Sequence, residues 1–371
     1  MRILMIIDGL PGGGAEKVVL TLCQDIHHMG HRVTLLSLRD VCHYTLPQEV
    51  QYEVLKPLTY PSSWKDFTTH SRTAYALNHF ISLHETKEGT YDLICSHLYN
   101  TDRIVVHSQI SSKNIWFCVH SMLSTSYLWH RHGLDRWLKK KQITKLYSNK
   151  NIVSVSTSVA EDLVCNLSIT PRRLTVIHNP FQIDNILNKA IEKHNVPNSP
   201  YLIHVGRFHP HKRHDRLLLA YAESNIPAPL VLVGSGQIQQ INMIKKLAAK
   251  LHLLERIIFA GFHKNPYPLI KNAKMLILSS DSEGFGNVLV EALLCQTPVV
   301  STRCPGGPAE ILEKAGMGNM LTALTSHALA EKMKEVYLSP PAPIDKKRLM
   351  IYSSKIICQQ YLNLATQSQN K

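Results

Sequence analysis

The chain has 371 residues and a formal net charge of +14, and 44% of its residues are hydrophobic. This length suits two globular domains, and no apolar run approaches the roughly 18 residues of a membrane-spanning helix. The eight cysteines include no CxxC pair, so neither a zinc site nor a disulfide scaffold is indicated. We therefore expect a soluble or peripheral protein with reduced thiols, located in the cytoplasm.

Short apolar runs alternate with amphipathic stretches along most of the chain. In the first half, strands are expected at residues 2–7, 32–38, 91–96, 114–119 and 151–156, and a helix at 15–30. In the second half, strands are expected at 201–206, 229–234, 256–261, 274–279 and 297–301, and helices at 213–224, 237–253, 287–294, 307–316 and 347–366. Such alternation predicts an α/β protein with parallel sheets covered by helices.

The alternation weakens over residues 178–200, a polar stretch with prolines and asparagines that we interpret as a linker. The sequence then predicts two Rossmann-like domains that face each other across a cleft. We place the first domain at residues 1–178 and the second at 179–346. Residues 347–371 are expected to form a C-terminal helix that crosses back to the first domain.

A glycine-rich turn, GGGAEK at Gly12–Lys17, follows the first predicted strand and leads into a helix. Glycines such as Gly13 and Gly14 let a backbone approach a ligand closely, and a helix N-terminus favours anions. The sequence is neither a Walker loop nor a GxGxxG motif, and an ordinary strand-to-helix turn explains it equally well.

Two cations, Arg207 and Lys212, follow the strand at 201–206, where ligands bind in open α/β sheets. An arginine and a lysine at this position suit a diphosphate. We interpret the neighbouring Arg213 and Arg216 as part of a solvated basic loop. The segment also holds four histidines, His204, His209, His211 and His214. Their spacing matches no familiar zinc motif, so no metal is expected there.

The stretch SSDSEGFGNVLVEALL carries two glutamates. Glu283 falls in the loop after a strand, and Glu291 lies in a helix that begins near Gly286 or Asn287 and is apolar nearly all round. A glutamate in such a buried helix is costly unless it is paired. Two carboxylates here suit the hydroxyl groups of a sugar and a ribose, and a purely structural partner for Glu291 is the alternative.

A fourth candidate is His120, which follows the strand at 114–119. A lone histidine at the end of a strand is more often structural than functional. It becomes a candidate because it would face the same cleft as the charged residues.

Together these segments resemble the retaining family-4 glycosyltransferases, which have the GT-B fold. Their E-x7-E signature is matched by Glu283 and Glu291, and V-G-R-x-x-x-x-K is matched by Val205–Lys212. The N-terminal GGAE and VIHNP at Val176–Pro180 also fit. The segment CPGGPAEIL at Cys304–Leu312 looks like the variant common in bacterial surface-polysaccharide enzymes. The resemblance covers essentially the whole chain.

The resemblance implies an acceptor-binding first domain and a second domain that binds a nucleotide sugar. Four residues would be catalytic. Arg207 and Lys212 would bind the donor diphosphate and stabilise its charge, Glu283 would contact sugar hydroxyls, and His120 would lie near the reacting carbon. Glu291 would bind the ribose.

Further donor-site residues are implied by the same resemblance. The sugar and phosphate would be seated at the helix N-terminus by Gly284, Phe285, Gly286 and Asn287. Gly13 and Gly14 would line the phosphate or acceptor side, and Gly261 and Phe262 would lie beside the nucleobase.

The implied reaction moves a hexose or N-acetylhexosamine from a nucleotide sugar, UDP-linked, to a growing lipid-linked surface glycan such as lipopolysaccharide, O-antigen or capsule. It would retain the anomeric configuration. No metal or other cofactor is expected, because fixed cations and a helix dipole can stabilise the departing diphosphate. Residues 40–90 carry no motif that identifies the acceptor.

Residues 127–150 carry seven Lys or Arg and one Asp, with Trp129 and Trp137 among them. Basic residues interleaved with aromatics suit an anionic bilayer surface. We expect peripheral attachment to the cytoplasmic face of the inner membrane through this segment. A solvated basic helix is the alternative.

Two other classes of protein fit parts of the pattern. A nucleotide-sugar epimerase or a phosphorylase can share the fold, but E-x7-E together with V-G-R-x-x-x-x-K favours transfer. A non-enzymatic protein that binds membranes or nucleic acid would explain the net charge. No recognisable nucleic-acid module is present, so a nucleic-acid partner is not expected.

Overall fold

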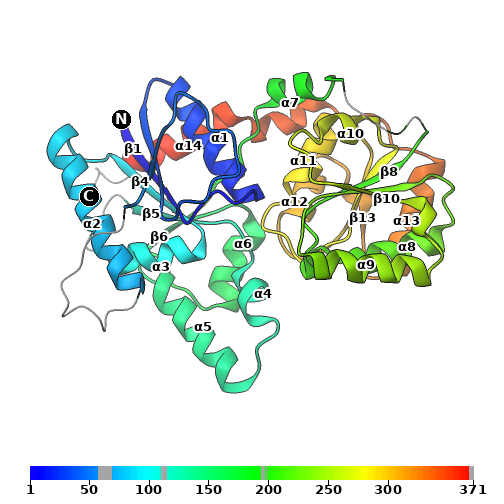
Figure 1. Ribbon diagram of the computed structural model, residues 1–371, viewed down its shortest axis with the longest axis horizontal. Helices are drawn as coiled ribbons and strands as arrows, with labels where there is room; N and C mark the ends of the chain where they lie inside the picture. The colour runs from blue at the N-terminus through cyan, green and yellow to red at the C-terminus, as the bar shows by residue number, and fades with distance from the viewer. Residues whose placement is uncertain (57–68, 109, 111–114, 194–196, 198, 367–371) are drawn as a thin grey trace. The chain divides into compact units, whose positions relative to one another are not determined.

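The computed structural model describes residues 1–56, 69–108, 110, 115–193, 197 and 199–366. The chain forms two compact units (Figure 1). The N-terminal unit comprises Met1–Phe181 together with Tyr352–Lys371, and the C-terminal unit comprises Gln182–Ile351. The chain therefore leaves the first unit once and returns to it near its end.

The N-terminal unit is built on a seven-stranded parallel sheet in the order β3-β2-β1-β4-β5-β6-β7. Its strands are β1 (Arg2–Ile7), β2 (Arg32–Ser37), β3 (Gln51–Val54), β4 (Leu93–His97), β5 (Ile115–Val119), β6 (Asn151–Ser154) and β7 (Arg173–Val176). Strands β4 and β5 are buried along their whole length, as expected for a parallel sheet with helices on both faces.

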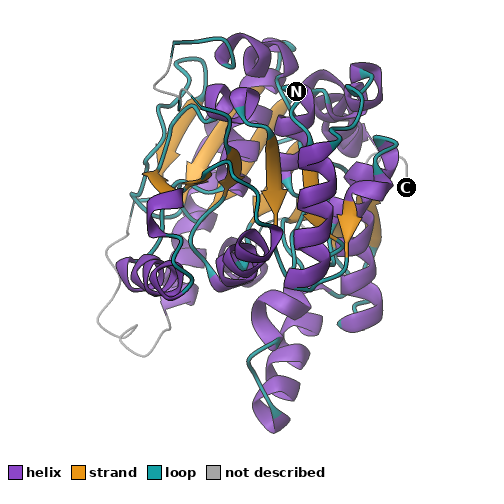
Figure 2. Ribbon diagram, turned by 90° about the vertical axis from the view of Figure 1, so that its right-hand side faces the viewer, coloured by secondary structure: helices purple, strands orange, loops and turns teal. Residues whose placement is uncertain are grey.

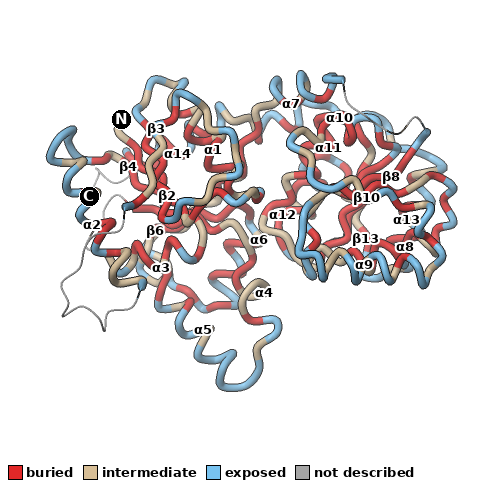
Figure 3. Tube along the Cα trace, viewed as in Figure 1, coloured by how far each residue is buried: buried red, intermediate tan, exposed pale blue. Residues whose placement is uncertain are grey.

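The helices of this unit are α1 (Gly14–His28), α2 (Thr69–Glu88), α3 (Tyr99–His107), α4 (Leu123–Leu128), α5 (Gly133–Tyr147), α6 (Thr157–Glu161), the π-helix η3 (Asp162–Asn166) and α14 (Ser354–Thr366). Helices α1 and α14 pack against each other. One core cluster joins them to the sheet, so the last helix completes the hydrophobic core of the first unit. Buried strands at the centre of the fold are drawn in red in Figure 3.

The C-terminal unit has a six-stranded parallel sheet in the order β10-β9-β8-β11-β12-β13. Its strands are β8 (Leu202–Val205), β9 (Leu230–Val233), β10 (Ile257–Gly261), β11 (Met275–Leu278), β12 (Val299–Thr302) and β13 (Leu321–Thr322). Its helices are α7 (Ile183–Lys189), α8 (His214–Ser224), α9 (Ile238–Lys250), α10 (Tyr267–Asn272), α11 (Asn287–Leu294), α12 (Gly307–Lys314) and α13 (Ser326–Leu338). Figure 2 shows the strands enclosed by helices.

The first six strands of the N-terminal sheet and the six strands of the C-terminal sheet have the same order when counted along the chain. The order reverses between β1 and β4 in the first unit and between β8 and β11 in the second. In open α/β sheets, ligands bind at the carboxyl ends of the strands beside this reversal, because the loops diverge there. The sheets confirm the predicted α/β class, and each strand expected from the sequence is present.

Local signals account for several helix boundaries. Ser156 precedes α6 and its side chain accepts a hydrogen bond from the N–H of Val159, while Thr325 precedes α13 and accepts from Ala328. These side chains satisfy amides that have no partner within the helix. None of the helices in the described ranges is long and apolar enough to span a bilayer.

Two predicted segments differ from the structure. Residues 178–200, predicted to be an irregular linker, contain α7, which packs against α10 and α11. The helix predicted at 347–366 is broken into a 3₁₀ helix, η7 (Lys346–Tyr352), and α14. The break falls at Ser353 because this residue forms a β-bridge to Phe181, where the chain crosses between the units.

Candidate active site

The loops that follow β8 and β11 bring the two predicted charged groups together. Nζ of Lys212 lies 2.5 Å from Oε1 of Glu283, and the same oxygen accepts a hydrogen bond of 2.6 Å from Ser280. The two loops are tied by the backbone as well, because the N–H of Asp281 donates to the carbonyl of His211. The structure therefore places Lys212 and Glu283 at the strand reversal of the C-terminal unit.

Arg207 lies on the loop after β8 but points to solvent. Its side chain is exposed and forms no ion pair within the part of the chain that the structure describes. One cation of this loop is thus held by a carboxylate and the other is available to an anion. A diphosphate could bind to both, since it carries enough charge to share Lys212 with Glu283.

The interpretation of Arg213 and Arg216 as a solvated loop is wrong. The side chain of Arg216 is only 6% exposed, and it donates to the carbonyl of Ser279 at 2.8 Å and to Asp281 at 2.5 Å. Arg213 pairs with Asp215 and with Asp281. The reason is geometric: α8 begins at His214, and its first turn carries Arg216 beneath the end of β11.

Glu291 is buried in α11, as its apolar surroundings predict. Its relative exposure is 7%, and the hydroxyl of the buried Tyr267 lies 3.4 Å from Oε1. Helix α11 begins at Asn287, directly after Gly286, whose φ of +96° is a conformation that favours glycine. Phe285 is buried and Gly284 is half-buried, so the predicted residues of this loop all lie at the N-terminal end of α11.

A second glycine loop supports the first. A Cβ atom on Gly306 would collide with the backbone carbonyl of Glu283, and one on Gly307 would collide with the backbone of Phe285. The N–H of Glu283 donates to the carbonyl of Pro305 at 3.0 Å. These contacts fix the position of Glu283. Although the CPGGP segment stood out in the sequence, its role as a support was not predicted.

The remaining predicted donor-site residues lie at the neighbouring strand end. Gly261 is the last residue of β10 and has a φ of +72°, and Phe262 follows it with 60% of its side chain exposed. An exposed aromatic ring at the carboxyl end of a strand is free to stack on a planar ligand.

Two of the four histidines in residues 204–214 are buried rather than ligand-like. The rings of His204 and His214 lie 4.7 Å apart, and His214 stacks on Phe208. Burial lowers the pKa of His204 to about 4 and that of His214 to about 2, so both are neutral at physiological pH. His209 and His211 form a separate pair of rings on the exposed face.

The glycine turn of the N-terminal unit follows β1. Gly13 is the buried N-cap of α1 and Gly14 is exposed as its first residue. A Cβ atom on Gly13 would collide with the carboxylate of Glu16, and the carbonyl of Gly13 accepts a hydrogen bond of 2.6 Å from Tyr44. A carboxylate folded back on the helix N-terminus stabilises it electrostatically.

His120 follows β5, as predicted, and has a partner that the sequence did not reveal. Its Nε2 lies 2.9 Å from Nδ1 of His97, the last residue of β4. Burial lowers the pKa of His120 to about 4, so the ring is neutral at physiological pH. A histidine on a neighbouring strand end could have been found by pairing the ends of the predicted strands.

His97 also lies near two thiols. Cys95, His97 and Cys118 are the one group of three potential metal ligands within the ranges that the structure describes. All three are buried on the same face of adjacent strands. Both ring nitrogens of His97 already contact other side chains, Nδ1 that of His120 and Nε2 that of Met5. The expectation that no metal is required stays a prediction.

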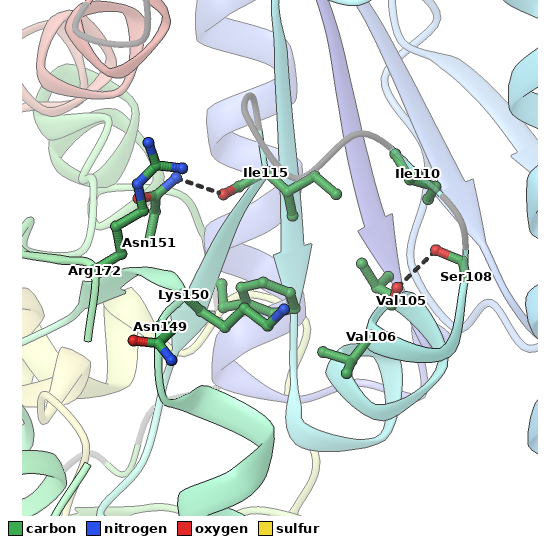
Figure 4. A pocket seen from close by; sticks show the side chains of 10 residues that line it. Val105, Val106, Ser108, Ile110, Ile115, Asn149, Lys150, Asn151 and Arg172 are labelled. Atoms are coloured by element: carbon green, nitrogen blue, oxygen red, sulfur yellow. Dashed lines mark hydrogen bonds between the residues drawn. The ribbon is translucent and has the colours of Figure 1, made fainter. Parts of the chain in front are cut away.

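A cavity of about 70 Å³ in the N-terminal unit is separate from these residues (Figure 4). It is lined by residues that include Ile115 and Asn151, which begin β5 and β6. The cavity thus lies at the amino ends of the strands, opposite to the edge where His120 and His97 lie. It is not part of the candidate site.

Solved structures share this fold. Sucrose-phosphate synthase from Thermosynechococcus elongatus aligns over 99% of this chain and 98% of its own, with a TM-score of 0.80 at 20% identity. Alr3699/HepE from Anabaena, solved in complex with UDP and glucose, aligns over the same shares with a TM-score of 0.71 at 20% identity. The chain therefore has the two-domain GT-B fold that the sequence predicts.

The family follows from the sequence matches. Residues 12–185 match the family described as Glycosyltransferase Family 4, and residues 188–355 match Glycosyl transferases group 1. The chain belongs to the family-4 glycosyltransferases, so the predicted family and fold are confirmed. A relative from Campylobacter jejuni, N-acetylgalactosamine-N,N'-diacetylbacillosaminyl-diphospho-undecaprenol 4-alpha-N-acetylgalactosaminyltransferase, is 26% identical over 340 residues, which are 88% of each chain.

Proposed function

We propose that the protein transfers a hexose or N-acetylhexosamine from a UDP-linked donor to a growing lipid-linked surface glycan, with retention of the anomeric configuration. The acceptor proposal is supported by the name of the Campylobacter relative, which acts on a diphospho-undecaprenol glycan. The donor proposal is supported by the UDP bound to the Anabaena protein. The reaction requires no metal in this proposal.

The observation that carries the proposal is the pairing of Lys212 with Glu283 beside Arg207. A lysine and an arginine at one strand end offer a point charge and a planar fork to a diphosphate. The carboxylate of Glu283 remains able to accept hydrogen bonds from sugar hydroxyls. The loops after β8 and β11 thus offer cations for the diphosphate of a nucleotide sugar and a hydrogen-bond acceptor for the hydroxyl groups of its sugar.

In the proposed reaction, the bond between the anomeric carbon and the phosphate oxygen breaks. An oxygen of the acceptor hydroxyl bonds to that carbon on the same face, and its proton passes to the departing diphosphate. Negative charge therefore grows on the diphosphate in the transition state. Lys212, Arg207 and the N-terminal amides of α11 stabilise it, and Lys212 and the amides are already held in place by the fold.

Glu291 is proposed to accept hydrogen bonds from the ribose hydroxyls. It lies just beyond the first turn of α11, and the hydroxyl of Tyr267 is beside it. A carboxylate oxygen has more than one lone pair, so Glu291 can accept a hydrogen bond from a ribose hydroxyl in addition to that of Tyr267, or in its place.

A thermal-unfolding experiment with UDP, GDP, ADP and NAD tests the donor site. A ligand at 100 times its dissociation constant stabilises a protein by about 2.7 kcal/mol. We expect UDP to raise the unfolding temperature of the wild type and of Lys250→Ala, and to have much less effect on Lys212→Ala and Glu291→Ala. Lys250 is a matched control because it lies on the exposed end of α9. Stabilisation by NAD alone would contradict a glycosyltransferase donor site.

We further propose that the first half of α5 binds the cytoplasmic face of an anionic membrane. Residues 132–138 are exposed on all sides, and Leu134, Trp137 and Leu138 have exposed fractions of 70%, 53% and 51%. Their spacing places them on one face of the helix. Figures 1 and 3 show α5 extending away from the sheet of its unit with this half exposed.

The base of α5 is anchored, which makes its tip a rigid projection. The hydroxyl of Tyr147 donates to the buried Asp102 at 2.5 Å, and Ser96 donates to the other oxygen. Lys141 lies over the ring of Trp137 at 5.0 Å, so cations and aromatic rings alternate at the tip. Large exposed apolar side chains among basic residues are typical of interfacial helices.

Vesicle sedimentation tests this attachment. We expect the wild type to bind phosphatidylglycerol vesicles better than phosphatidylcholine vesicles, and to lose this binding in Lys140→Glu/Lys141→Glu and in Leu134→Ser/Trp137→Ser. Lys139 is left unchanged because it donates to the hydroxyl of Tyr99. Lys246→Glu/Lys250→Glu on α9 carries the same charge change and should still bind. Equal binding by all variants would exclude α5 as the contact.

A further inference from the structure

One face of the N-terminal sheet gathers three sulfur atoms around the ring of His97. In the parallel register, Cys95 lies opposite Met5 of β1, and His97 lies opposite Cys118 of β5. Cys95 and His97 are two residues apart on β4, so their side chains point to the same face of the sheet. The register therefore brings a methionine, two cysteines and a histidine together near the carboxyl end of these strands.

The potential ligand atoms are close enough to share one ion. The Sγ atoms of Cys95 and Cys118 and a ring nitrogen of His97 all lie within 4.8 Å of one another. A point between three such atoms is at most about 2.8 Å from each of them, whereas zinc bonds are about 2.3 Å long to a thiolate and about 2.1 Å long to an imidazole. Shifts of at most about 0.7 Å therefore complete three bonds.

Met5 places a fourth potential ligand beside this group. Its Sδ lies 3.4 Å from Nε2 of His97, and Met5 is the register partner of Cys95. Nε2 is therefore the ring nitrogen that faces the sulfur atoms. Tetrahedral bonds of the usual lengths separate a nitrogen ligand from a sulfur ligand by about 3.6 Å, close to the observed distance. Thiolate and thioether sulfurs are ligands that soft ions prefer.

Two neighbouring side chains are placed to support the ligands. Nδ1 of His97 lies 2.9 Å from Nε2 of His120, and the hydroxyl of Tyr361 on α14 donates to Sγ of Cys118 at 3.9 Å. A histidine that binds a metal through one nitrogen generally donates its other N–H to an acceptor, which orients the ring. With an ion on Nε2 of His97, Nδ1 carries the proton and His120 is that acceptor.

The group can also balance the charge of a divalent ion within the core. Cys95, His97 and Cys118 are fully buried, and burial raises the pKa of the Cys118 thiol, so this thiol keeps its proton until an ion replaces it. When Zn²⁺ binds, the two thiol protons pass to solvent, and the two thiolates cancel the two positive charges. The imidazole and the thioether add ligands without adding charge.

We propose that Met5, Cys95, His97 and Cys118 form a site for one thiophilic divalent ion such as Zn²⁺. The ion joins β1, β4 and β5 at a place that Tyr361 of α14 covers, and so stabilises the N-terminal unit. Its role is structural. It takes no part in the proposed transfer reaction, which requires no metal, and the inference does not depend on that reaction.

Cobalt binding tests the site. Reduced full-length protein is unfolded in urea and refolded with excess Co²⁺, because the ligands are buried in the folded chain. We expect one Co²⁺ per chain, with the visible absorption of tetrahedral cobalt and a thiolate-to-metal band in the near ultraviolet, both lost when Zn²⁺ is added. Cys95→Ala/Cys118→Ala should show neither band. Cys23→Ala/Cys358→Ala is the matched control, since it removes two thiols from the same core, and it should keep both bands.

Thermal unfolding supplies a second readout. Zn²⁺ at 100 times its dissociation constant should raise the unfolding temperature of the wild type and of Cys23→Ala/Cys358→Ala, but not that of Cys95→Ala/Cys118→Ala. Mg²⁺, which prefers oxygen ligands, should raise none of them.

Tyr361→Phe keeps the test decisive if the double variants do not fold. It removes only the hydroxyl beside Cys118 and should weaken Co²⁺ binding about tenfold. A refolded wild type without the thiolate band, a band that persists in Cys95→Ala/Cys118→Ala, or an unchanged Co²⁺ affinity in Tyr361→Phe would overturn the inference.

Discussion

At the strand reversal of the C-terminal unit the predicted site residues Lys212 and Glu283 form an ion pair, whereas at that of the N-terminal unit the predicted site residue His120 is neutral. Lys212 is held by Glu283, and Arg216 by Asp281. In the other unit, His120 is held by His97 through one neutral hydrogen bond. The first six strands of the two sheets have the same order, so the difference lies in the residues at the strand ends and not in the fold.

In the proposed reaction, negative charge develops on the departing diphosphate, and fixed cations stabilise such charge. The charged residues at the strand reversal of the C-terminal unit suit that proposed role. Substitutions that remove a charged side chain, a buried polar side chain or a glycine with positive φ test this comparison.

The largest effect is expected from removal of the paired cation. Lys212→Met should lower the rate of sugar transfer by about 10²–10³-fold, the usual effect of removing one preorganised electrostatic group from a transition state. Lys250→Met, on an exposed helix end, should leave the rate unchanged. Steady-state measurement of UDP release checks both. A less than tenfold loss would mean that the diphosphate is stabilised chiefly by other groups.

A large effect on stability is expected from the buried arginine. Arg216→Met leaves Asp281 with one partner fewer and the carbonyl of Ser279 without its donor. The free energy of unfolding of the C-terminal unit should fall by about 3 kcal/mol. Arg303→Met is the control, since Arg303 and Glu313 are both exposed by more than half and such a pair contributes about 0–1 kcal/mol. Equal urea midpoints for the two variants would show that Arg216 is not a structural cation.

A pH dependence follows from the buried histidines of the C-terminal unit. The pKa of His214 falls from an unfolded value of about 6.5 to about 2 in the folded protein, so between these values only the unfolded chain binds the proton. The stability that His214 contributes is therefore present above pH 6.5 and is lost as the pH falls. At pH 5 the loss is about 2 kcal/mol.

His214→Phe removes this titration. The difference between the free energies of unfolding at pH 8 and pH 5 should shrink by about 2 kcal/mol relative to the wild type. His130→Phe, at an exposed position of the N-terminal unit, should keep the wild-type difference. Denaturant titrations at the two pH values measure it, and an unchanged difference in His214→Phe would mean that other groups cause the acid sensitivity.

The smallest effect is expected at the start of α11. Gly286 has a φ of +96°, which an alanine adopts at a cost of about 1–2 kcal/mol. Gly286→Ala should lower the unfolding temperature, and Gly286→Asn should lower it less, because asparagine tolerates positive φ better. Identical effects of the two substitutions would mean that the added side chain is crowded by Pro308, whose Cγ is the nearest heavy atom to a Cβ at this position.

The fold was largely predictable because its strands are apolar runs bounded by turns. The strands missed were β3, β7 and β13, which are short or only half-buried and so lack a continuous apolar run. The burial of Glu291 was predictable for a related reason, since α11 is apolar on every side. Its partner was not, because Tyr267 lies 24 residues away on another helix.

The site was predictable only where charge marks it. Arg207, Lys212 and Glu283 stand at strand ends, and the structure brings Lys212 and Glu283 together. The prediction for Arg216 was wrong because a charged residue is normally solvated. Only the tertiary structure shows that the carboxylate of Asp281 pairs with its buried side chain. His97 directly follows the strand predicted at 91–96, but it was missed because its contact with His120 depends on the order of the strands in the sheet.

The crossing between the units also determines the order in which they can fold during synthesis. Phe181 and Tyr352 are joined by a backbone hydrogen bond of 2.9 Å, so the C-terminal unit is a continuous insertion within the N-terminal one. The core of the N-terminal unit includes Ile357, Tyr361 and Leu362 of α14. These residues leave the ribosome after the whole of the C-terminal unit, so that unit can finish folding while the first still exposes the apolar surface that α14 will cover.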